Sequence, residues 1–436
     1  MKVSLFQGIL MGVFVLGAAV GLFVFATYTS KNTANTIGPV LVWGTLPRED
    51  IDATLATISQ SEQGLKNLSY VEKDPKTLAA DLSSAIATGA SPDLVLASQE
   101  ELYTLSKFLT PIPHSTLPMR TFQDTFVGEG NLFLAQGGEG YYGVPFLVDP
   151  LVLFANHSIL SSSGIAKPPA TWEALVGLVP TVALLTPNRQ ITRGLIALGT
   201  YDNVHSARAV FSSLLFQTNI PVSTYSPSGA LVASLGSSSD DSGGAPPGRS
   251  VLGFYTQFAD PSKVSYTWNA SLPDSERMFL TGDLALYLGY ASRARYLRQA
   301  NPNLDFDVAP LPQPATATVK SVYGLVYALM IPRGAKNPSG AYQATTLLVS
   351  PLEQAAAAKH TGLAPATLSQ LASAPSDPVA AVTYAGALYS KGWLSPLPAS
   401  VDTIFSGMIG DVISGRSSLN AALTSAERAL GALLRQ

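Results

Sequence analysis

The chain has 436 residues, 47% of them hydrophobic and only 13% charged, so it can bury a large core and is long enough for two domains. The formal net charge is −3, from 26 basic and 29 acidic residues, which disfavours a nucleic-acid partner because such binding depends on clustered lysine and arginine. The absence of cysteine excludes disulfides, thiol catalysis, cysteine-ligated zinc and an N-terminal lipidated cysteine.

The N-terminus carries a long apolar run. Lys2 and Lys31 bracket 28 uncharged residues. As a helix, such a run extends about 40 Å, which is enough to cross a hydrocarbon core of about 30 Å. The apolar region of a cleaved signal peptide is shorter, about 7–15 residues. We therefore expect a retained single-pass anchor at 3–30 and a polar tether at 31–38, with the rest of the chain outside the cell; cleavage after Ala26 is the alternative.

The next stretch alternates between strand and helix patterns. VLVWGT (40–45) is typical of a strand, residues 48–64 of a helix closed by Gly64, and SPDLVLAS (91–98) of a later strand. This alternation predicts an α/β domain with a largely parallel sheet. Trp43 and Gln99 stand where strands end, and open α/β sheets bind ligands at that edge. Both are candidate ligand-binding residues, with packing as the alternative for Trp43.

One acid interrupts a nearly unbroken apolar stretch, YYGVPFLVDPLVLFANHSIL (141–160). The acid is Asp149, and the pattern around it predicts a buried strand. Aromatic residues precede the strand, and of these Tyr142 is a candidate ligand contact. A carboxylate facing a binding site accepts hydrogen bonds that its charge strengthens. The alternative is that Asp149 caps nearby backbone amides or reaches solvent.

Further along the chain, aromatic residues supply the other candidates. Trp268 lies in the polar loop SYTWNASLPDS, where core packing explains a tryptophan poorly. Tyr290 ends the strand pattern LALYLGY, and Tyr323 begins another, YGLVYALM. Rings of this kind stack on the C–H faces of sugars, although each could line a core instead.

The remaining segments predict structure rather than chemistry. Residues 194–219 suggest two helical segments, residues 236–250 a polar surface loop, and residues 351–436 mostly helix. Arg293, Arg295 and Arg298 form a solvated run. The four histidines lack the spacing of metal ligands, and neither a phosphate-binding loop nor a Gly-x-Ser-x-Gly elbow is present. We therefore expect no catalytic residue, metal or cofactor.

Five short motifs resemble one known family in order and spacing. They are GVP (143–145), FAN (154–156), PPATWE (168–173), FLTGDLA (279–285) and the pattern from Asn301 to Pro312. Together they resemble the extracellular solute-binding proteins of ABC transporters, in the branch that includes maltose-binding protein. The chain departs from many relatives in lacking a lipid-anchored cysteine, which the N-terminal helix would replace.

The resemblance implies a type 2 periplasmic-binding-protein fold, in which two α/β lobes enclose a cleft. It places lobe 1 at 39–148 and 313–350, and lobe 2 at 149–312 and 351–436. Residues 143–151 are then the first crossing between the lobes, with Asp149 facing the cleft. The implied partners are a small polar ligand, such as a sugar or oligosaccharide, and an ABC permease in the membrane.

A different class of function stays open on the same scaffold, namely a cell-surface glycan-acting enzyme or a ligand sensor. An enzyme of this kind needs two carboxylates about 5–10 Å apart. The predicted cleft segments offer Asp149 but no clear second acid, so we favour a binding protein without covalent chemistry.

Overall fold

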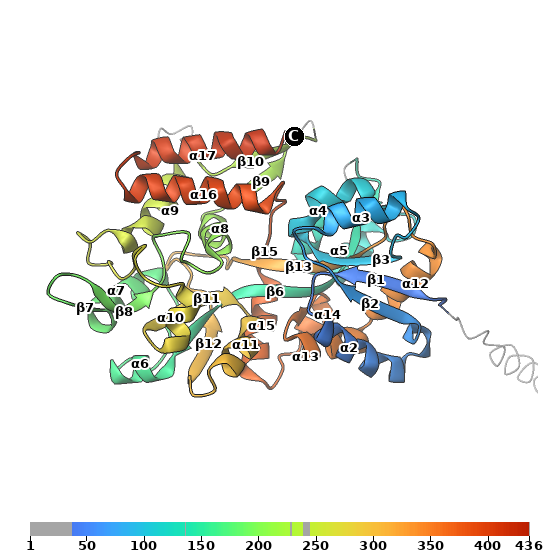
Figure 1. Cartoon of the computed structure of the whole chain (residues 1–436), viewed down its shortest axis with the longest axis horizontal. Coiled ribbons are helices and arrows are strands. Elements are labelled where there is room, and N and C mark those ends of the chain that lie inside the picture. The colour runs from blue at the N-terminus through green and yellow to red at the C-terminus, as the bar shows by residue number, and fades with distance from the viewer. Residues whose placement is uncertain (1–36, 136, 227–228, 239–244, 436) are drawn as a thin grey trace, which may run out of the picture.

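The computed structural model of the chain describes residues 37–135, 137–226, 229–238 and 245–435. The predicted anchor at 3–30 lies outside the described residues, as does most of the tether at 31–38. Within the described ranges, no helix is both long enough and apolar enough to cross a bilayer. Figure 1 shows two lobes side by side, with β-strands running between them.

Lobe 1 is the predicted α/β unit. Its sheet has the order β2-β1-β3-β13-β6, and its first three strands are parallel. Helices lie on both sides of this sheet, with α3 and α4 above it and α2 below it in Figure 1. The elements that alternate along the chain are β1 (Val40–Gly44), α2 (Arg48–Ser61), β2 (Leu68–Glu72), α3 (Leu78–Ala87), β3 (Leu94–Ser98) and α4 (Gln99–Leu105).

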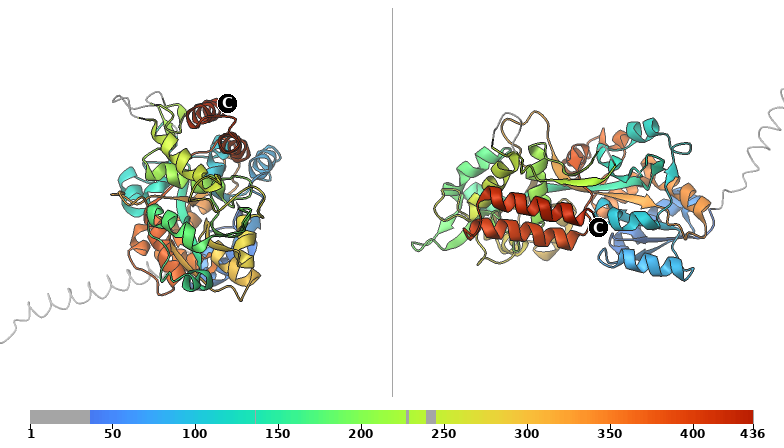
Figure 2. Two further views of the ribbon diagram at one scale, coloured as in Figure 1. Left: turned by 90° about the vertical axis from the view of Figure 1, so that its left-hand side faces the viewer. Right: turned by 90° about the horizontal axis from the view of Figure 1, so that it is seen from above.

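Lobe 2 is built around a sheet with the order β6-β11-β8-β7, and β12 pairs with the other edge of β6. The C-terminal helices α16 and α17 pack against each other, and the right-hand view of Figure 2 shows them on this lobe. Its main elements are β8 (Ile191–Ile196), α8 (Ala207–Gln217), β11 (Leu284–Tyr290), α11 (Arg293–Ala300), β12 (Phe306–Pro310), α16 (Pro398–Ile413) and α17 (Leu419–Leu433).

A single strand belongs to both lobes. β6 (Gly143–Asn156) is buried along its whole length, and its first half pairs with β13 (Val322–Met330) in the sheet of lobe 1. Its second half pairs with β11 and β12 in lobe 2. The apolar run is therefore a crossing segment, as predicted, because a strand inside two sheets has no face open to water.

The shorter elements complete the two lobes. They are η1 (Gln63–Leu65), η2 (Ser106–Phe108), β4 (Ile112–Pro113), α5 (Met119–Thr125), η3 (Gly128–Phe133), β5 (Gly140–Tyr141), α6 (His157–Ser162), α7 (Trp172–Val182), β7 (Leu184–Leu185), β9 (Val222–Tyr225), β10 (Leu231–Ser234), α9 (Pro247–Thr256), η4 (Gln257–Ala259), α10 (Ser275–Thr281), α12 (Pro338–Leu348), α13 (Pro351–Thr361), β14 (Ala364–Pro365), α14 (Leu368–Leu371), α15 (Pro378–Leu388) and β15 (Ser390–Lys391).

Three predictions about these segments were wrong. Residues 194–196, predicted as helix, belong to strand β8, which lies parallel to β11 in the interior of the sheet. The sequence of a strand buried on both faces has no alternation of polar and apolar residues that would distinguish it from a buried helix. The loop predicted at 236–250 is shorter, because α9 starts at Pro247. Residues 351–371, predicted in lobe 2, lie with lobe 1, since α13 packs against α2 and β14 pairs with β6 at residues 147–148.

Gly199, at the start of the loop after β8, occupies a position that only glycine fits. Its φ is +104°, and a Cβ there would lie 2.6 Å from the backbone nitrogen of Ala259. Gly199→Ala is therefore expected to lower the free energy of unfolding by about 2–4 kcal/mol. Gly407→Ala, within α16 and with open space around the added methyl, should raise it by about 0.5–1 kcal/mol. Urea unfolding compares the two variants, and equal effects would contradict this account of Gly199.

Candidate functional site between the lobes

Asp149 lies on the crossing strand β6, at the junction of the lobes. Its side chain is buried, and Oδ1 accepts a hydrogen bond of 3.1 Å from the backbone nitrogen of Ser292. Burial raises the pKa of this carboxyl group to about 6, because the charged form loses hydration. The residue also lines a cavity of about 270 Å³. The lone acid of the apolar run is thus part of a polar site between the lobes.

The walls of this cavity come from both lobes and are held together by an ion pair. Asp50 belongs to α2 of lobe 1, whereas Arg295 and Tyr296 belong to α11 of lobe 2. Nη2 of Arg295 donates to both carboxylate oxygens of Asp50, at 2.6 Å each. Nη1 of the same arginine donates to the carbonyl oxygen of His360 at 2.9 Å. The two lobes therefore meet across the cavity.

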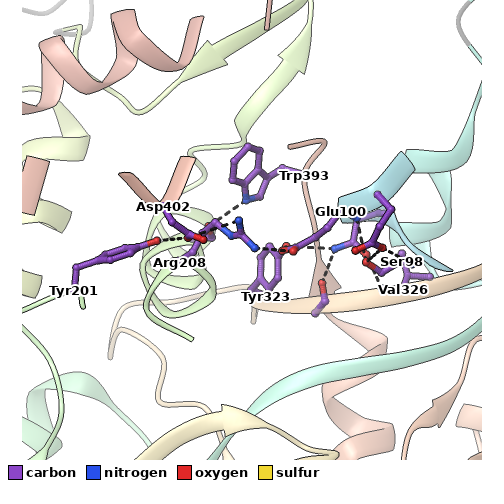
Figure 3. Close-up of polar contacts among 12 residues, drawn as sticks. Ser98, Glu100, Tyr201, Arg208, Tyr323, Val326, Trp393 and Asp402 are labelled. Atoms are coloured by element: carbon purple, nitrogen blue, oxygen red, sulfur yellow. Dashed lines mark hydrogen bonds and ion pairs between the residues drawn. The ribbon is translucent and has the colours of Figure 1, made fainter. Parts of the chain in front are cut away.

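A second contact between the lobes centres on Arg208 and is drawn in Figure 3. Arg208, on α8 of lobe 2, donates through Nη2 to Oε2 of Glu100, on α4 of lobe 1, at 2.6 Å. Its Nη1 lies 3.6 Å from Oδ1 of Asp402, which also accepts a 2.6 Å hydrogen bond from the hydroxyl of Tyr201. The hydroxyl of Tyr323 donates to Oε1 of Glu100.

Two tyrosines, Tyr290 and Tyr327, interact electrostatically with the acids at these two contacts. Burial and the charge of Glu100 raise the pKa of Tyr290 well above its usual value, and Asp149 adds to the effect. Burial and the charge of Asp149 likewise raise the pKa of Tyr327 on β13. Both phenols keep their protons at neutral pH and remain hydrogen-bond donors. Acids, an arginine and tyrosines from both lobes therefore share one junction, which is the set of groups that hydrogen-bonds a polyhydroxyl ligand.

Of the residues predicted from the sequence, the structure brings Asp149, Tyr290 and Tyr323 to this junction. Gln99 is adjacent but engaged with the backbone of β13. Its Nε2 donates to the carbonyl oxygen of Gly324 at 2.9 Å, and its Oε1 accepts from the nitrogen of Val326 at 2.8 Å. Gln99 therefore ties α4 to β13.

Three other predicted residues lie elsewhere. Trp43 is partly buried beside the core, and Nζ of Lys73 stands 3.9 Å from its ring centroid. Tyr142 borders a void of about 20 Å³, room for no more than one water. Trp268 was misjudged, since it is fully buried in the core of lobe 2 and its Nε1 donates to Asn203 at 3.2 Å. A tryptophan in a polar loop can therefore still have its side chain in the core.

Sequence reasoning missed Glu100, Arg208 and Asp402 altogether. Only Glu100 carried a signal, because it stands next to Gln99 at the carboxyl end of a strand. Arg295, predicted in a solvated run, is 46% exposed and also pairs with the buried carboxylate of Asp50.

Two α/β lobes that share strand β6, with polar groups of both lobes gathered at their junction, define the two-lobe periplasmic-binding-protein fold. Residues 55–383 match the family of bacterial extracellular solute-binding proteins, and the chain belongs to that family. A comparison with curated proteins found no match.

Solved structures with this fold include several sugar-binding proteins. The cyclic alpha-maltosyl-1,6-maltose binding protein from Arthrobacter globiformis has a TM-score of 0.73 and 17% identity, over 91% of this chain and 100% of that one. The GacH receptor of Streptomyces glaucescens, solved unliganded and with acarbose, has a TM-score of 0.66 and 16% identity, over 92% and 99%. The maltose/maltodextrin-binding domain MalE from Bdellovibrio bacteriovorus, bound to maltotriose, has a TM-score of 0.65 and 16% identity, over 91% and 100%.

Proposed function

We propose that this protein is the substrate-binding subunit of an ABC importer and binds a sugar or oligosaccharide between its lobes. The observation that carries the proposal is the junction itself, where Asp149, Tyr290 and the Glu100–Arg208 pair lie together in a member of the solute-binding family. The sugar ligands of the similar structures support the ligand class.

The proposed mechanism is closure of the lobes around the ligand. A ligand that touches groups from both lobes binds the closed form more tightly than the open form, and so shifts the population toward closure. Asp149 would accept ligand hydroxyls, Arg208 would donate to them, and the rings of Tyr290 and Tyr327 would pack on C–H faces. None of these roles requires a covalent step.

We further propose that residues 3–30 anchor the protein in the membrane with the lobes outside the cytoplasm. Tethering beside a permease raises the local concentration of the loaded binding protein. The expected result is that the full chain sediments with membranes and resists extraction by high salt, while a chain that starts at residue 37 stays in the supernatant. Recovery of the full chain in the soluble fraction would contradict the anchor without touching the ligand proposal.

A thermal-shift screen of the full chain in mild detergent tests the ligand class. A sugar present at about 100 times its Kd should stabilise the fold by about 2.7 kcal/mol and raise the melting temperature. Maltodextrins and mannooligosaccharides are the first compounds to compare, with amino acids and polyamines as negative controls. Silence across all sugars, or turnover of any glycan, would overturn the proposal.

A further inference from the structure

A second and larger cavity lies at the junction of the lobes, away from Asp149. Its volume is about 610 Å³, and it shares no described lining residue with the cavity at Asp149. Its walls come from η3 of lobe 1, from the end of α8 and from β9 of lobe 2, and from β15. The volume falls in the range of small-molecule sites.

Glu129 lines this cavity, and its carboxyl group is buried. Its side chain is buried, and Oε2 accepts a hydrogen bond of 2.5 Å from the hydroxyl of Ser390. Its other oxygen, Oε1, has no hydrogen-bond partner among the described residues. Burial raises the pKa of this carboxyl group to about 8, which favours the protonated form at neutral pH. A protonated carboxyl can both donate and accept, which is the partner that a hydroxyl group needs.

The rest of the lining includes buried apolar side chains and two lysines. Phe216, Ile220 and Leu394 are buried and contribute carbon surface to this lining. Lys320 and Lys391 are the basic residues of the described lining, and Glu129 is its one acidic residue. The two lysines would repel a cationic ligand and attract an anionic group.

We propose that this cavity binds a small amphipathic hydroxy acid, with its hydroxyl group on Glu129, its apolar body against Phe216, Ile220 and Leu394, and its carboxylate at Lys320 and Lys391. This site is independent of the sugar site proposed above. The two cavities differ in charge, because three acids, Glu49, Asp50 and Asp149, line the cavity at Asp149.

A set of matched probes tests the proposal on the full chain, by calorimetry and by ligand-observed NMR. The reference probe is 3-(4-hydroxyphenyl)propionate. Removing its hydroxyl group, as in 3-phenylpropionate, or its charge, as in 3-(4-hydroxyphenyl)propionamide, should each weaken binding about tenfold. The charge-dependent part should also shrink at high salt.

Variants of the lining give the decisive comparison. Glu129→Leu should abolish the preference for the hydroxylated probe, and Lys320→Gln with Lys391→Gln should abolish the preference for the carboxylate. Asp149→Asn should leave both preferences unchanged. Because Glu129→Leu replaces a buried acid by an apolar side chain, its melting temperature serves as the check on folding. Equal binding of all probes to the wild type and to Glu129→Leu would overturn the proposal, and so would no binding of any probe at millimolar concentration.

Discussion

Replacing Arg208 by methionine is expected to lower the free energy of unfolding by about 3–5 kcal/mol. The reason is the carboxylate that the change leaves behind. The side chains of Arg208 and Glu100 are only 15% and 12% exposed, and their 2.6 Å contact joins the two lobes. Without the guanidinium group, Glu100 keeps the hydroxyl of Tyr323 as its hydrogen-bond donor but loses its counter-charge. Urea unfolding monitored by tryptophan fluorescence gives the measurement.

The control for this prediction is an exposed pair of the same type. Arg416 lies 2.7 Å from Asp411, but their side chains are 67% and 44% exposed, so Arg416→Met should cost less than about 1 kcal/mol. The double variant Arg208→Met/Glu100→Gln removes both charges and should be more stable than the sum of the single changes predicts, by about 1–3 kcal/mol. Additive effects would mean that the two residues do not act as a pair.

The two interlobe ion pairs differ in exposure and therefore in expected strength. Arg208 and Glu100 are both largely buried, whereas Arg295 is 46% exposed while its partner Asp50 is 7% exposed. Solvent screens the second pair more strongly. A ligand that enters the junction near Glu100 competes with a strong internal contact, so its hydroxyls must replace the hydrogen bonds that it disrupts. A polyhydroxyl compound meets this requirement better than an apolar one.

The fold was largely accessible from the sequence because its signals are local. Strands and helices alternate along residues 40–105, and the crossing strand β6 can be recognised in the sequence as an apolar run with no polar face. The same reasoning failed for residues 194–196, because a short buried strand shows no alternation of polar and apolar residues that would identify it as a strand.

The candidate site was accessible only in part, because its partners are far apart in sequence. Glu100 and Arg208 are 108 residues apart, and no pattern around Arg208 distinguishes it from an exposed arginine of an amphipathic helix. Asp149 could be found because a charged residue inside an apolar run is anomalous wherever it occurs. Trp268 shows the opposite failure, since its polar neighbours in sequence do not reveal that Asn203 satisfies its indole nitrogen inside a core.

Asp149→Asn is expected to stabilise the ligand-free protein at pH 7 by up to about 3 kcal/mol. This is the free energy that corresponds to a pKa shift of about two units. The folded protein binds the proton of Asp149 more tightly than the unfolded chain does, because burial raises the pKa from 3.8 to about 6. The contribution of this bound proton to the free energy of unfolding is fully present below pH 3.8. It is lost as the pH rises through about 6. Asparagine keeps an oxygen for the 3.1 Å hydrogen bond from Ser292 and carries no charge that must be buried.

The comparison with the wild type isolates this one group, because Glu101 and Glu129 also have raised pKa values and titrate in both proteins. The two unfolding free energies should agree near pH 3 and separate between pH 4 and pH 7, with the variant the more stable. A constant difference across that range would show that the charge of Asp149 is not the cause. In the proposed sugar complex the order reverses: a carboxylate accepts ligand hydroxyls more strongly than an amide oxygen does, so affinity should fall by about 10- to 100-fold. A residue that lowers stability when empty and raises affinity when occupied is the expected signature of a binding site, whereas a merely structural carboxylate would change stability alone.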